Sequence, residues 1–258
     1  MKRIVILPYK MESGSAKDLA DALGVRRVYP DRLYKPRSND LIVNWGYSSF
    51  PQFLSNLSDS RASEIDILNQ PEAVKIASNK LLALQRLKEA GIAIPRFTPD
   101  KLEASRKFGT VYARTVLNGN SGEGIIYVPD QEMLPDAPLY VEGLKTKAEY
   151  RVHVFGGQVI SYAKKMRDLD YPNGEPNENI RSHNNGWVFC RDGLRRLERI
   201  EHLAIEAVSC LGLDFGGVDI VRDEDNNCFV LEVNTACGIE GQTLQAYVEA
   251  IQNYANRE

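Results

Sequence analysis

The sequence has 258 residues, of which 43% are hydrophobic and 26% are charged. These proportions, with only 19 Gly and 12 Pro, exclude disordered, collagen-like and coiled-coil chains. The formal net charge is only −3, but it is unevenly spread, because residues 1–199 carry 30 basic and 24 acidic side chains while residues 200–258 carry 2 and 11. The acidic final segment is either solvated surface or a source of metal-binding carboxylates.

The opening residues predict a small parallel sheet. Residues 3–7 form a short apolar run rich in β-branched residues, residues 16–23 read as a helix that ends at Gly24, and residues 41–43 form a second apolar run. The order strand, helix, strand is typical of parallel sheets. No early apolar run is long enough for a signal peptide or a membrane span, and the four cysteines show no CxxC spacing. We therefore expect a cytoplasmic protein without a membrane partner.

Pro71 begins the clearest helix of the chain. Asn69 or Gln70 can cap it, and proline suits the first turn because its missing N–H would have no partner there. Apolar residues then recur at helical spacing as far as Gly91, which is a helix stop. The pattern predicts one continuous helix.

The rest of the chain reads as strands joined by tight turns, with further helices between them. Gly156-Gly157 is typical of a two-residue hairpin turn. Residues 168–186 are polar and rich in turn residues, which predicts a mobile loop. The predicted helices cover residues 102–108, 194–211 and 244–254, and the predicted strands cover residues 110–116, 125–128, 139–142, 150–155, 158–165, 215–221 and 228–233.

The strongest candidate site consists of Asp219, Glu232 and Asn234. Glu232 and Asn234 are two residues apart in one predicted strand, so their side chains project from the same face. Asp219 can lie opposite Glu232 if the strands pair across the turn at residues 223–227. Two carboxylates and an amide oxygen are hard ligands that suit Mg²⁺ bound together with nucleotide phosphates. Acidic residues beside a surface hairpin are the alternative, and spacing alone does not separate the two.

A glycine-rich stretch, Asn-Gly-Asn-Ser-Gly-Glu-Gly at residues 118–124, lies between two predicted strands. Glycines let backbone N–H groups approach phosphate closely, so Gly119, Ser121, Gly122 and Gly124 are candidates for nucleotide binding. The stretch is not a P-loop, because no Gly-Lys-Ser/Thr follows, and it is not a Rossmann fingerprint, because a strand follows it. By itself it also fits a flexible hairpin loop.

Five basic residues are candidates for contact with phosphate: Lys80, Arg114, Arg151, Lys165 and Arg181. Cations that face a cleft would balance the charge of a triphosphate and of a phosphoryl group in transfer. Most Lys and Arg side chains are solvated surface. Arg151 is distinguished from them because it lies within a predicted strand.

In chain order these features resemble an ATP-grasp ligase, closest to the branch of ribosomal-protein glutamate ligases and related carboxylate–amine ligases. The resemblance runs from about residue 69 to residue 254. Its specific part is the pair of segments 215–219 and 231–234 (Phe-Gly-Gly-Val-Asp and Leu-Glu-Val-Asn), which resemble the two metal strands of the family. Other similar segments are Asn79-Lys80-Leu81 with Gly91-Ile92 and Pro95, residues 111–114 with residues 119–124, residues 139–144 and residues 149–152.

The resemblance implies an α/β protein with the ATP-grasp fold and a small N-terminal parallel-sheet lobe. It divides the chain into an N-terminal lobe on the substrate side (residues 1–68), a lid lobe (69–141) and a metal and catalytic lobe (142–258). It also implies residue roles: phosphate contacts for Lys80, Arg114 and the glycine loop, an adenine hinge at Glu142, Gly143 and Leu144, Mg²⁺ ligands at Asp219, Glu232 and Asn234, and contacts to the γ-phosphate and the acyl phosphate for Arg151, Lys165 and Arg181.

The implied activity is an ATP-dependent carboxylate–amine ligase with two Mg²⁺ ions, for which Mn²⁺ is an alternative. ATP would convert a substrate carboxylate to an acyl phosphate, and an amine of an amino acid, peptide or protein would then form an amide. Two departures from the family pattern, Arg114 in place of Lys and Cys237 in place of Pro, motivate an alternative, an ATP-binding module without ligation. We interpret Cys237 as a small buried residue. Binding to nucleic acid is disfavoured because the basic residues are dispersed, and an oligomer remains open.

Overall fold

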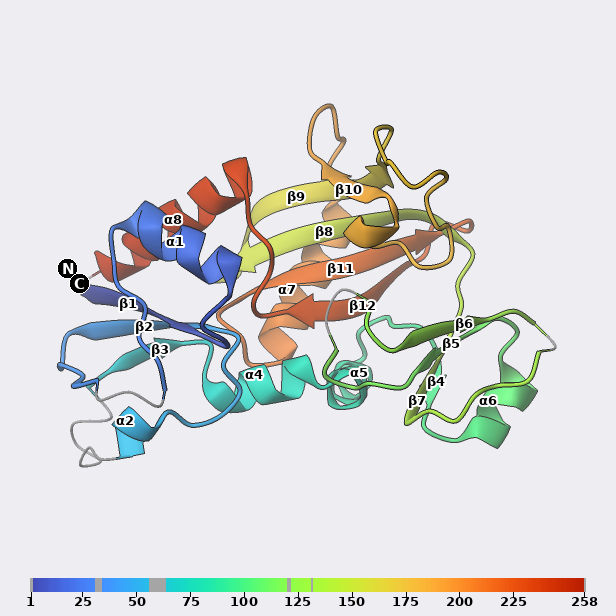
Figure 1. The fold of residues 1–258 in the computed structure, drawn as a ribbon, viewed down its shortest axis with the longest axis horizontal. Coiled ribbons are helices and arrows are strands. Elements are labelled where there is room, and N and C mark those ends of the chain that lie inside the picture. The colour runs from blue at the N-terminus through green and yellow to red at the C-terminus, as the bar shows by residue number, and fades with distance from the viewer. Residues whose placement is uncertain (1, 31–33, 56–63, 120–121, 131, 258) are drawn as a thin grey trace.

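The computed structural model describes residues 2–30, 34–55, 64–119, 122–130 and 132–257, which form three sheets and the helices around them (Figure 1). The first sheet is parallel, in the order β1 (Arg3–Pro8), β2 (Asp40–Trp45), β3 (Asp66–Leu68). It carries α1 (Gly14–Leu23) and the short α2 (Gln52–Ser55). Ser13 accepts a hydrogen bond from the Ala16 N–H at the start of α1, and Gly24 ends α1 in the left-handed conformation, with φ +66°. The predicted parallel sheet and its helix are confirmed.

The last helix of the chain completes the core of this first sheet. Side chains of α8 (Gly241–Ala255) pack with α1, with β1 and β2, and with Phe155 and Phe215 of the central sheet. The buried Trp45 ring stacks on Phe215 at a centroid distance of 5.4 Å and meets the edge of Tyr247 at 5.3 Å. The beginning and the end of the chain therefore share one hydrophobic core.

The predicted long helix from Pro71 is wrong, because the structure has two helices in its place, α4 (Pro71–Ser78) and α5 (Lys80–Glu89). Asn79 separates them in an extended conformation, and its side chain accepts hydrogen bonds from the N–H groups of Leu81 and Leu82. An asparagine at this position competes with helix continuation by capping the next helix. The break places Lys80 at the first turn of α5.

Neither predicted cap of α4 acts as one. Gln70 makes no side-chain cap bond. Asn69 is buried with φ +61°, and its side chain accepts from the N–H groups of Asp214 and Phe215 and donates to the Phe215 carbonyl. Asn69 therefore joins the segment after the first sheet to the start of β11 (Phe215–Asp223).

The lid sheet is antiparallel, in the order β4 (Phe97–Thr98), β7 (Leu139–Glu142), β5 (Val111–Arg114), β6 (Ile125–Val128). One helix, α6 (Lys101–Lys107), packs against β4 and β7. The core of this unit is a cluster of residues between 104 and 140. The predicted strands at 125–128 and 139–142 match β6 and β7 residue for residue.

The central sheet is antiparallel, in the order β10 (Trp187–Cys190), β9 (Gln158–Arg167), β8 (Thr146–Phe155), β11, β12 (Cys228–Asn234). Gly156 and Gly157 have φ of +56° and +76° and close the β8–β9 hairpin, as predicted. One face of the sheet packs on α7 (Glu198–Cys210) and on α4 and α5. The strand β10 was not predicted, and α7 begins four residues later than predicted.

Candidate active site

The face of the central sheet away from α7 carries rows of polar side chains across the strands. Asp219 of β11 lies opposite Arg151 of β8 on one side and opposite Glu232 of β12 on the other. Residues directly opposite one another in an antiparallel pair project from the same face. The predicted pairing of Asp219 with Glu232 is therefore confirmed, and Arg151 joins the same row.

A β-bulge in β12 aims Glu232 and Asn234 at this face. The register of β11 with β12 shifts between Asp219 and Ile220, where Glu232 is followed in the pairing by Val230, so Leu231 is an extra residue. Val230 and Val233 both lie in the hydrophobic core, although they are three positions apart and strict alternation would place them on opposite faces. Strict alternation from Val230 would turn Glu232 and Asn234 into the core, and the extra residue reverses that orientation.

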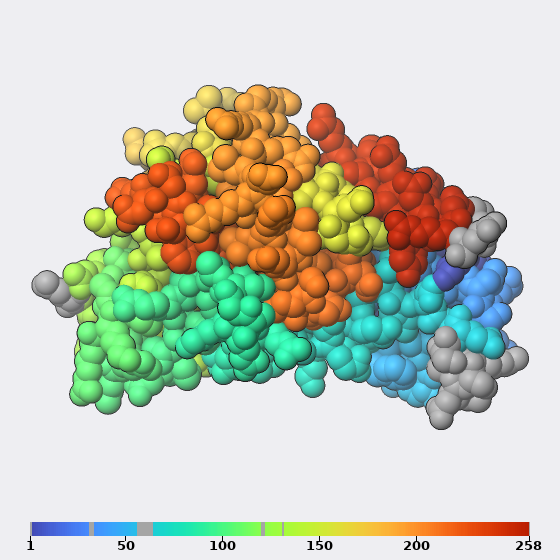
Figure 2. Space-filling view, turned by 180° about the vertical axis from the view of Figure 1, so that it is seen from behind, coloured from blue at the N-terminus to red at the C-terminus, as the bar shows by residue number. Residues whose placement is uncertain are grey.

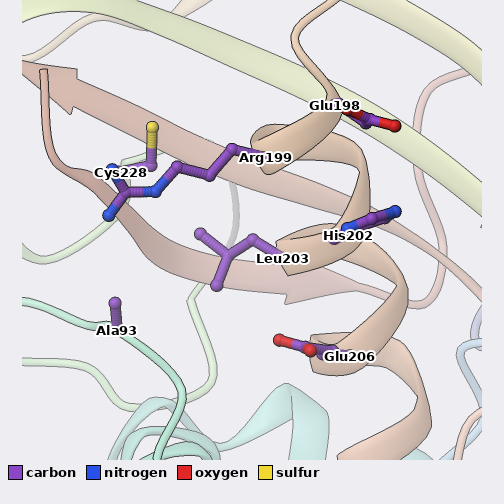
Figure 3. A pocket seen from close by; sticks show the side chains of 7 residues that line it. All are labelled: Ala93, Glu198, Arg199, His202, Leu203, Glu206 and Cys228. Atoms are coloured by element: carbon purple, nitrogen blue, oxygen red, sulfur yellow. The ribbon is translucent and has the colours of Figure 1, made fainter.

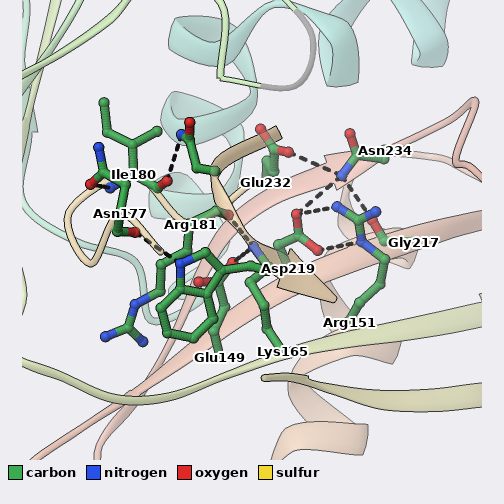
Figure 4. A network of polar contacts seen from close by, with 12 residues as sticks. Glu149, Arg151, Lys165, Asn177, Ile180, Arg181, Gly217, Asp219, Glu232 and Asn234 are labelled. Carbon is green, nitrogen blue, oxygen red and sulfur yellow. Dashed lines mark hydrogen bonds and ion pairs between the residues drawn. The ribbon is translucent and has the colours of Figure 1, made fainter. Parts of the chain in front are cut away.

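The acidic side chains are paired with cations (Figure 4). Arg151 donates from Nε and Nη2 to the two carboxylate oxygens of Asp219, each at 2.6 Å. Lys80 Nζ lies 3.3 Å from Glu232 Oε2. The Asn234 amide nitrogen lies 3.1 Å from Glu232 Oε1 and 3.5 Å from Asp219 Oδ2, so all three predicted metal ligands are neighbours.

Neighbouring charges shift the pKa values of Glu232 and Arg151 toward their charged forms. Burial raises the pKa of Glu232, but the charges of Lys80, Arg114 and Arg151 outweigh it and lower the pKa to about 2. Burial lowers the pKa of Arg151, but the charge and hydrogen bonds of Asp219 outweigh it and raise the pKa above its ordinary value. Two carboxylates and an amide at one point are the donor set that suits a hard divalent cation. The residues present therefore fit Mg²⁺, which would share each carboxylate with the cation that now contacts it.

Lys165 and Arg181 lie along the same face but are engaged differently. Lys165 Nζ pairs with the buried Glu149 carboxylate and donates to the Arg181 carbonyl at 2.8 Å. The Arg181 guanidinium lies over the Trp187 ring at 4.6 Å and donates to the Glu178 carbonyl, so in Figure 4 it points away from Asp219. Lys165 thus contributes its charged side chain to the site, whereas Arg181 contributes its backbone carbonyl.

The lid sheet brings Arg114 and the glycine loop over this face. Burial lowers the pKa of Arg114. The charge of Arg114 helps to lower the pKa of Glu232, although no hydrogen bond joins Arg114 to another described side chain. Lys80 donates from Nζ to the Gly119 carbonyl at 3.1 Å, and the Lys80 N–H donates to the Leu117 carbonyl. Lys80 therefore contacts both the glycine loop and a predicted metal ligand.

Gly122 and Gly124 have φ of +86° and +68°, so the loop needs glycine at both positions. A Cβ at Gly122 would lie 3.5 Å from the Ile180 side chain. The Tyr112 hydroxyl donates to the Asn179 carbonyl at 2.8 Å. The lid sheet and the segment 168–186 thus touch above the central sheet. Ser121, the remaining predicted loop residue, lies outside the described residues.

The predicted hinge lies between the lid sheet and β8. Glu142 ends β7, and its N–H donates to the Arg96 carbonyl while its carboxylate pairs with the Arg96 guanidinium. Gly143 donates to the Thr110 carbonyl at 2.7 Å, and a Cβ there would lie 2.7 Å from Thr110 Cγ2. The Leu144 N–H has no hydrogen-bond acceptor within the described chain, so it is available to a ligand.

A layer of buried side chains beneath the predicted metal ligands was not predicted from the sequence. His153 Nδ1 lies 3.2 Å from the Tyr247 hydroxyl, and burial, followed by the charges of two arginines, lowers the pKa of His153 to about 3. Cys237 is buried, as expected, and donates from Sγ to the Asn234 carbonyl at 3.2 Å. Burial raises the pKa of Cys237 to about 12, which keeps the thiol protonated and non-nucleophilic.

A cavity of about 410 Å³ lies elsewhere, between α7 and the edge of β12, and none of the predicted site residues lines it (Figure 3). Seen from behind, α7 lies near the middle of the molecular surface (Figure 2). Among the described residues, no three His, Cys, Asp or Glu side chains group as a metal site.

Comparison with known proteins agrees with this geometry. Residues 139–255, which include the row of Arg151, Asp219 and Glu232, match the RimK-like ATP-grasp domain. A probable alpha-L-glutamate ligase of Histophilus somni is 27% identical over 222 residues, which are 80% of this chain and 71% of that protein. One of Mannheimia succiniciproducens is 27% identical over the same length and coverage.

Solved structures confirm that the chain has the ATP-grasp fold. The ATP-grasp ligase PsnB, in complex with a precursor variant, Mg and ADP, superposes with a TM-score of 0.70 at 14% identity over 99% of both chains. A D-alanine–D-alanine ligase from Bacillus anthracis superposes with a TM-score of 0.67 at 14% identity over 98% of this chain and 93% of that one. No described helix of the protein has the length and apolar character needed to cross a membrane.

Proposed function

We propose that this RimK-like protein is an ATP- and Mg²⁺-dependent carboxylate–amine ligase. The observation that carries the proposal is the cluster of Asp219, Glu232 and Asn234, each within hydrogen-bond distance of another, beside Arg151 and Lys80. An oxygen of the substrate carboxylate attacks the γ-phosphorus of ATP and releases ADP. The nitrogen of an amine then attacks the acyl carbon of the acyl phosphate, releases phosphate, loses a proton and leaves an amide.

The side chains of Asp219, Glu232 and Asn234 would hold the metal, for which Mn²⁺ is a substitute. When bound, the metal neutralises phosphate oxygens and orients them for in-line transfer. Its ligands are already assembled, because the Asn234 amide lies within hydrogen-bond distance of both Asp219 and Glu232, and the charges of Lys80 and Arg151 favour the ionised form of Glu232. Little rearrangement of the backbone is then needed on binding.

The cations would move from the carboxylates to the phosphates. Lys80 and Arg114 would contact the nucleotide phosphates, and Arg151 and Lys165 would contact the transferred phosphoryl group. The carbonyl of Glu142 and the free N–H of Leu144 would bind adenine beside Gly143. Arg181 would have to turn away from Trp187 to reach substrate.

The covering loops would exclude water from the acyl phosphate. The glycine loop, through Gly119, Gly122 and Gly124, and the segment 168–186 already touch above the sheet. We place the substrate-side lobe at residues 1–68, the lid lobe at 69–141 and the metal lobe at 142–258. The three sheets support this division.

The test is ADP release with ATP, Mg²⁺ and a panel of amino acids and peptides that includes L-glutamate, with mass spectrometry of the products. Asp219→Asn and Glu232→Gln should each abolish ADP release and amide formation. Glu198→Gln and Glu206→Gln, which change carboxylates of the remote cavity, are the matched controls and should retain both. Undiminished ADP release in the Asp219→Asn, Glu232→Gln double variant would refute the metal assignment.

One alternative has an observation in its favour. Arg114 and Cys237 depart from the family pattern, and an ATP-binding module without ligation would tolerate both. Calorimetry that shows nucleotide binding, with no ADP formed across the whole panel, would favour this alternative. Any amide product would eliminate it.

A further inference from the structure

The ring of Phe189, in β10, contacts two of the cations that the proposed reaction assigns to the transferred phosphoryl group. The ring centroid lies 4.5 Å from the guanidinium carbon of Arg151 and 5.3 Å from Lys165 Nζ. The side chains of Arg151 and Lys165 are only 20% and 9% exposed, and Phe189 is half-buried. The attraction between a cation and the face of an aromatic ring is strongest when both are withdrawn from water. These two contacts therefore differ from the cation–ring contacts of an exposed surface.

The register of the central sheet explains how one ring reaches both cations. The strand β10 lies at the edge of the sheet beside β9, and Phe189 is directly opposite Lys165 (Figure 1). Arg151 is one strand further away, in β8, where it is opposite Ala163 of β9. Ala163 carries only a methyl group, so the ring and the guanidinium meet diagonally across β9. Strand pairing, and not a loop, therefore places Phe189 against Arg151 and Lys165.

Each of the two cations also has a carboxylate partner. Arg151 is paired with Asp219, and Lys165 is paired with Glu149. In the proposed reaction both cations turn from these carboxylates to the phosphoryl group. A carboxylate competes with phosphate oxygens for the same N–H donors, whereas an aromatic ring attracts a cation without accepting such strong hydrogen bonds. The contacts with Phe189 can therefore persist while the carboxylate contacts are exchanged.

We propose that Phe189 is a positioning residue of the active site, whose ring keeps Arg151 and Lys165 directed at the transferred phosphoryl group when they leave their carboxylate partners. This inference rests on the proposed ligase function. The two cations repel each other, and the partial negative charge on the face of the ring offsets that repulsion. A leucine at residue 189 would fill similar space but would supply no such charge.

The first experiment replaces Phe189 with phenylalanines that carry one, two and three ring fluorines. Fluorine withdraws the negative charge from the face of the ring and nearly preserves its shape, so the fold is not at risk. ADP release is measured with ATP, Mg²⁺ and the panel of amino acids and peptides that includes L-glutamate. We expect kcat to fall with each added fluorine. Phe189→Leu should lower kcat by about 5- to 30-fold, the factor for losing one or two such contacts, and Phe189→Tyr should retain kcat to within about 3-fold.

The second experiment does not depend on turnover. Calorimetry gives the Kd of ADP and of the non-hydrolysable analogue AMPPNP, each with Mg²⁺. Phe189→Leu should raise the Kd of AMPPNP by about 5- to 30-fold and the Kd of ADP by less than about 3-fold, because only AMPPNP carries the phosphoryl group that Arg151 and Lys165 would contact. Binding of ADP also reports that the variant is folded.

Tyr254→Leu is the matched control. The Tyr254 ring also contacts one lysine and one arginine, Lys2 and Arg257, near the two termini (Figure 1). Its replacement should leave kcat and both Kd values unchanged. An unchanged kcat along the fluorinated series, or an equal rise in the Kd of ADP and AMPPNP, would refute the role of Phe189 while the ligase function stands. If the wild type releases no ADP with any member of the panel, the ligase function fails, and the Kd of AMPPNP still decides the role of Phe189.

Discussion

A methyl group at Gly217 is expected to destabilise the protein through a collision with Cys237. Gly217 lies in β11 with ordinary strand geometry, so alanine suits its backbone and would by itself stabilise the strand by about 0.5–1 kcal/mol. An added Cβ, however, would overlap Cys237 Sγ and lie 3.1 Å from His153 Cε1. Both neighbours are buried and cannot move into solvent.

Overpacking of a buried site costs about 1–3 kcal/mol, so Gly217→Ala should lower the free energy of unfolding by about 1–2 kcal/mol after the gain in the strand is subtracted. Cys237→Ala should cost about 1 kcal/mol, because it removes one buried sulfur and its weak hydrogen bond to the Asn234 carbonyl. In the Cys237→Ala background the main collision is gone. The Gly217→Ala change should then cost less than about 0.5 kcal/mol, with a coupling energy of about 1 kcal/mol.

The assay is urea unfolding of the four proteins of the cycle, followed by circular dichroism. Gly238→Ala is the control, because a Cβ there meets nothing within 4 Å and should change the free energy of unfolding little. If the two single changes add to within about 0.3 kcal/mol in the double variant, Cys237 does not limit the space at Gly217 and the packing described here is incorrect.

Three further predictions concern other parts of the molecule. Because burial and two nearby guanidiniums lower the pKa of His153 to about 3, the unfolded chain binds a proton that the folded chain does not between roughly pH 3 and 6.5. As the pH falls through that window, the free energy of unfolding of the wild type should therefore decrease by about 1.4 kcal/mol per pH unit more than that of His153→Gln. Parallel curves of unfolding free energy against pH for the two proteins would contradict this prediction. Asn69→Ala should lower the free energy of unfolding in urea by about 3 kcal/mol or more, because it loses several buried hydrogen bonds and strains the backbone at φ +61°. Asn69→Gly loses the same hydrogen bonds without the strain, so its loss should be about 1 kcal/mol smaller. Equal losses in the two variants would exclude backbone strain. Tyr112→Phe removes the bond to the Asn179 carbonyl and should raise the ratio of phosphate released to amide formed several-fold, and an unchanged ratio would show that this contact does not exclude water.

Elements with strong local signals were predictable from the sequence. Gly24 and the pair Gly156-Gly157 mark a helix end and a turn that only positive φ allows, and both occur where predicted. Residues 125–128 and 139–142 are apolar runs bounded by turn residues, and they form strands with the predicted bounds. Each of these signals acts within a few residues and does not depend on the rest of the fold.

Features that depend on tertiary contacts were not predictable. Asn79 looks like an interior helix residue by apolar periodicity, yet its side chain caps α5 and breaks the helix. The strand β10 was not predicted although its residues, Trp-Val-Phe-Cys, favour strands, because the run is only four residues long and directly follows the polar segment 168–186. Asn69 was read as a cap, but its partners at residues 214 and 215 are distant in sequence.

The candidate site divides in the same way. Strand alternation predicts that the side chains of Glu232 and Asn234 share one face of the sheet. Which face they share depends on the bulge at Leu231, and that bulge follows only from the register with β11. The sequence therefore predicts which residue types could meet, and the pairing of distant strands decides which of them do.

The core shared by α1 and α8 has a consequence for the order in which the chain folds during synthesis. The lid sheet takes its core from residues 104–140, so it can fold as soon as that segment has left the ribosome. The first sheet emerges earlier but lacks the apolar partners that α8 supplies, among them the fully buried Tyr247 and Ile251. Residues 3–68 must therefore wait, with an apolar face exposed, until about residue 255 has been made. The first sheet is therefore completed only after α8 has been made, although it precedes the other two sheets in the sequence.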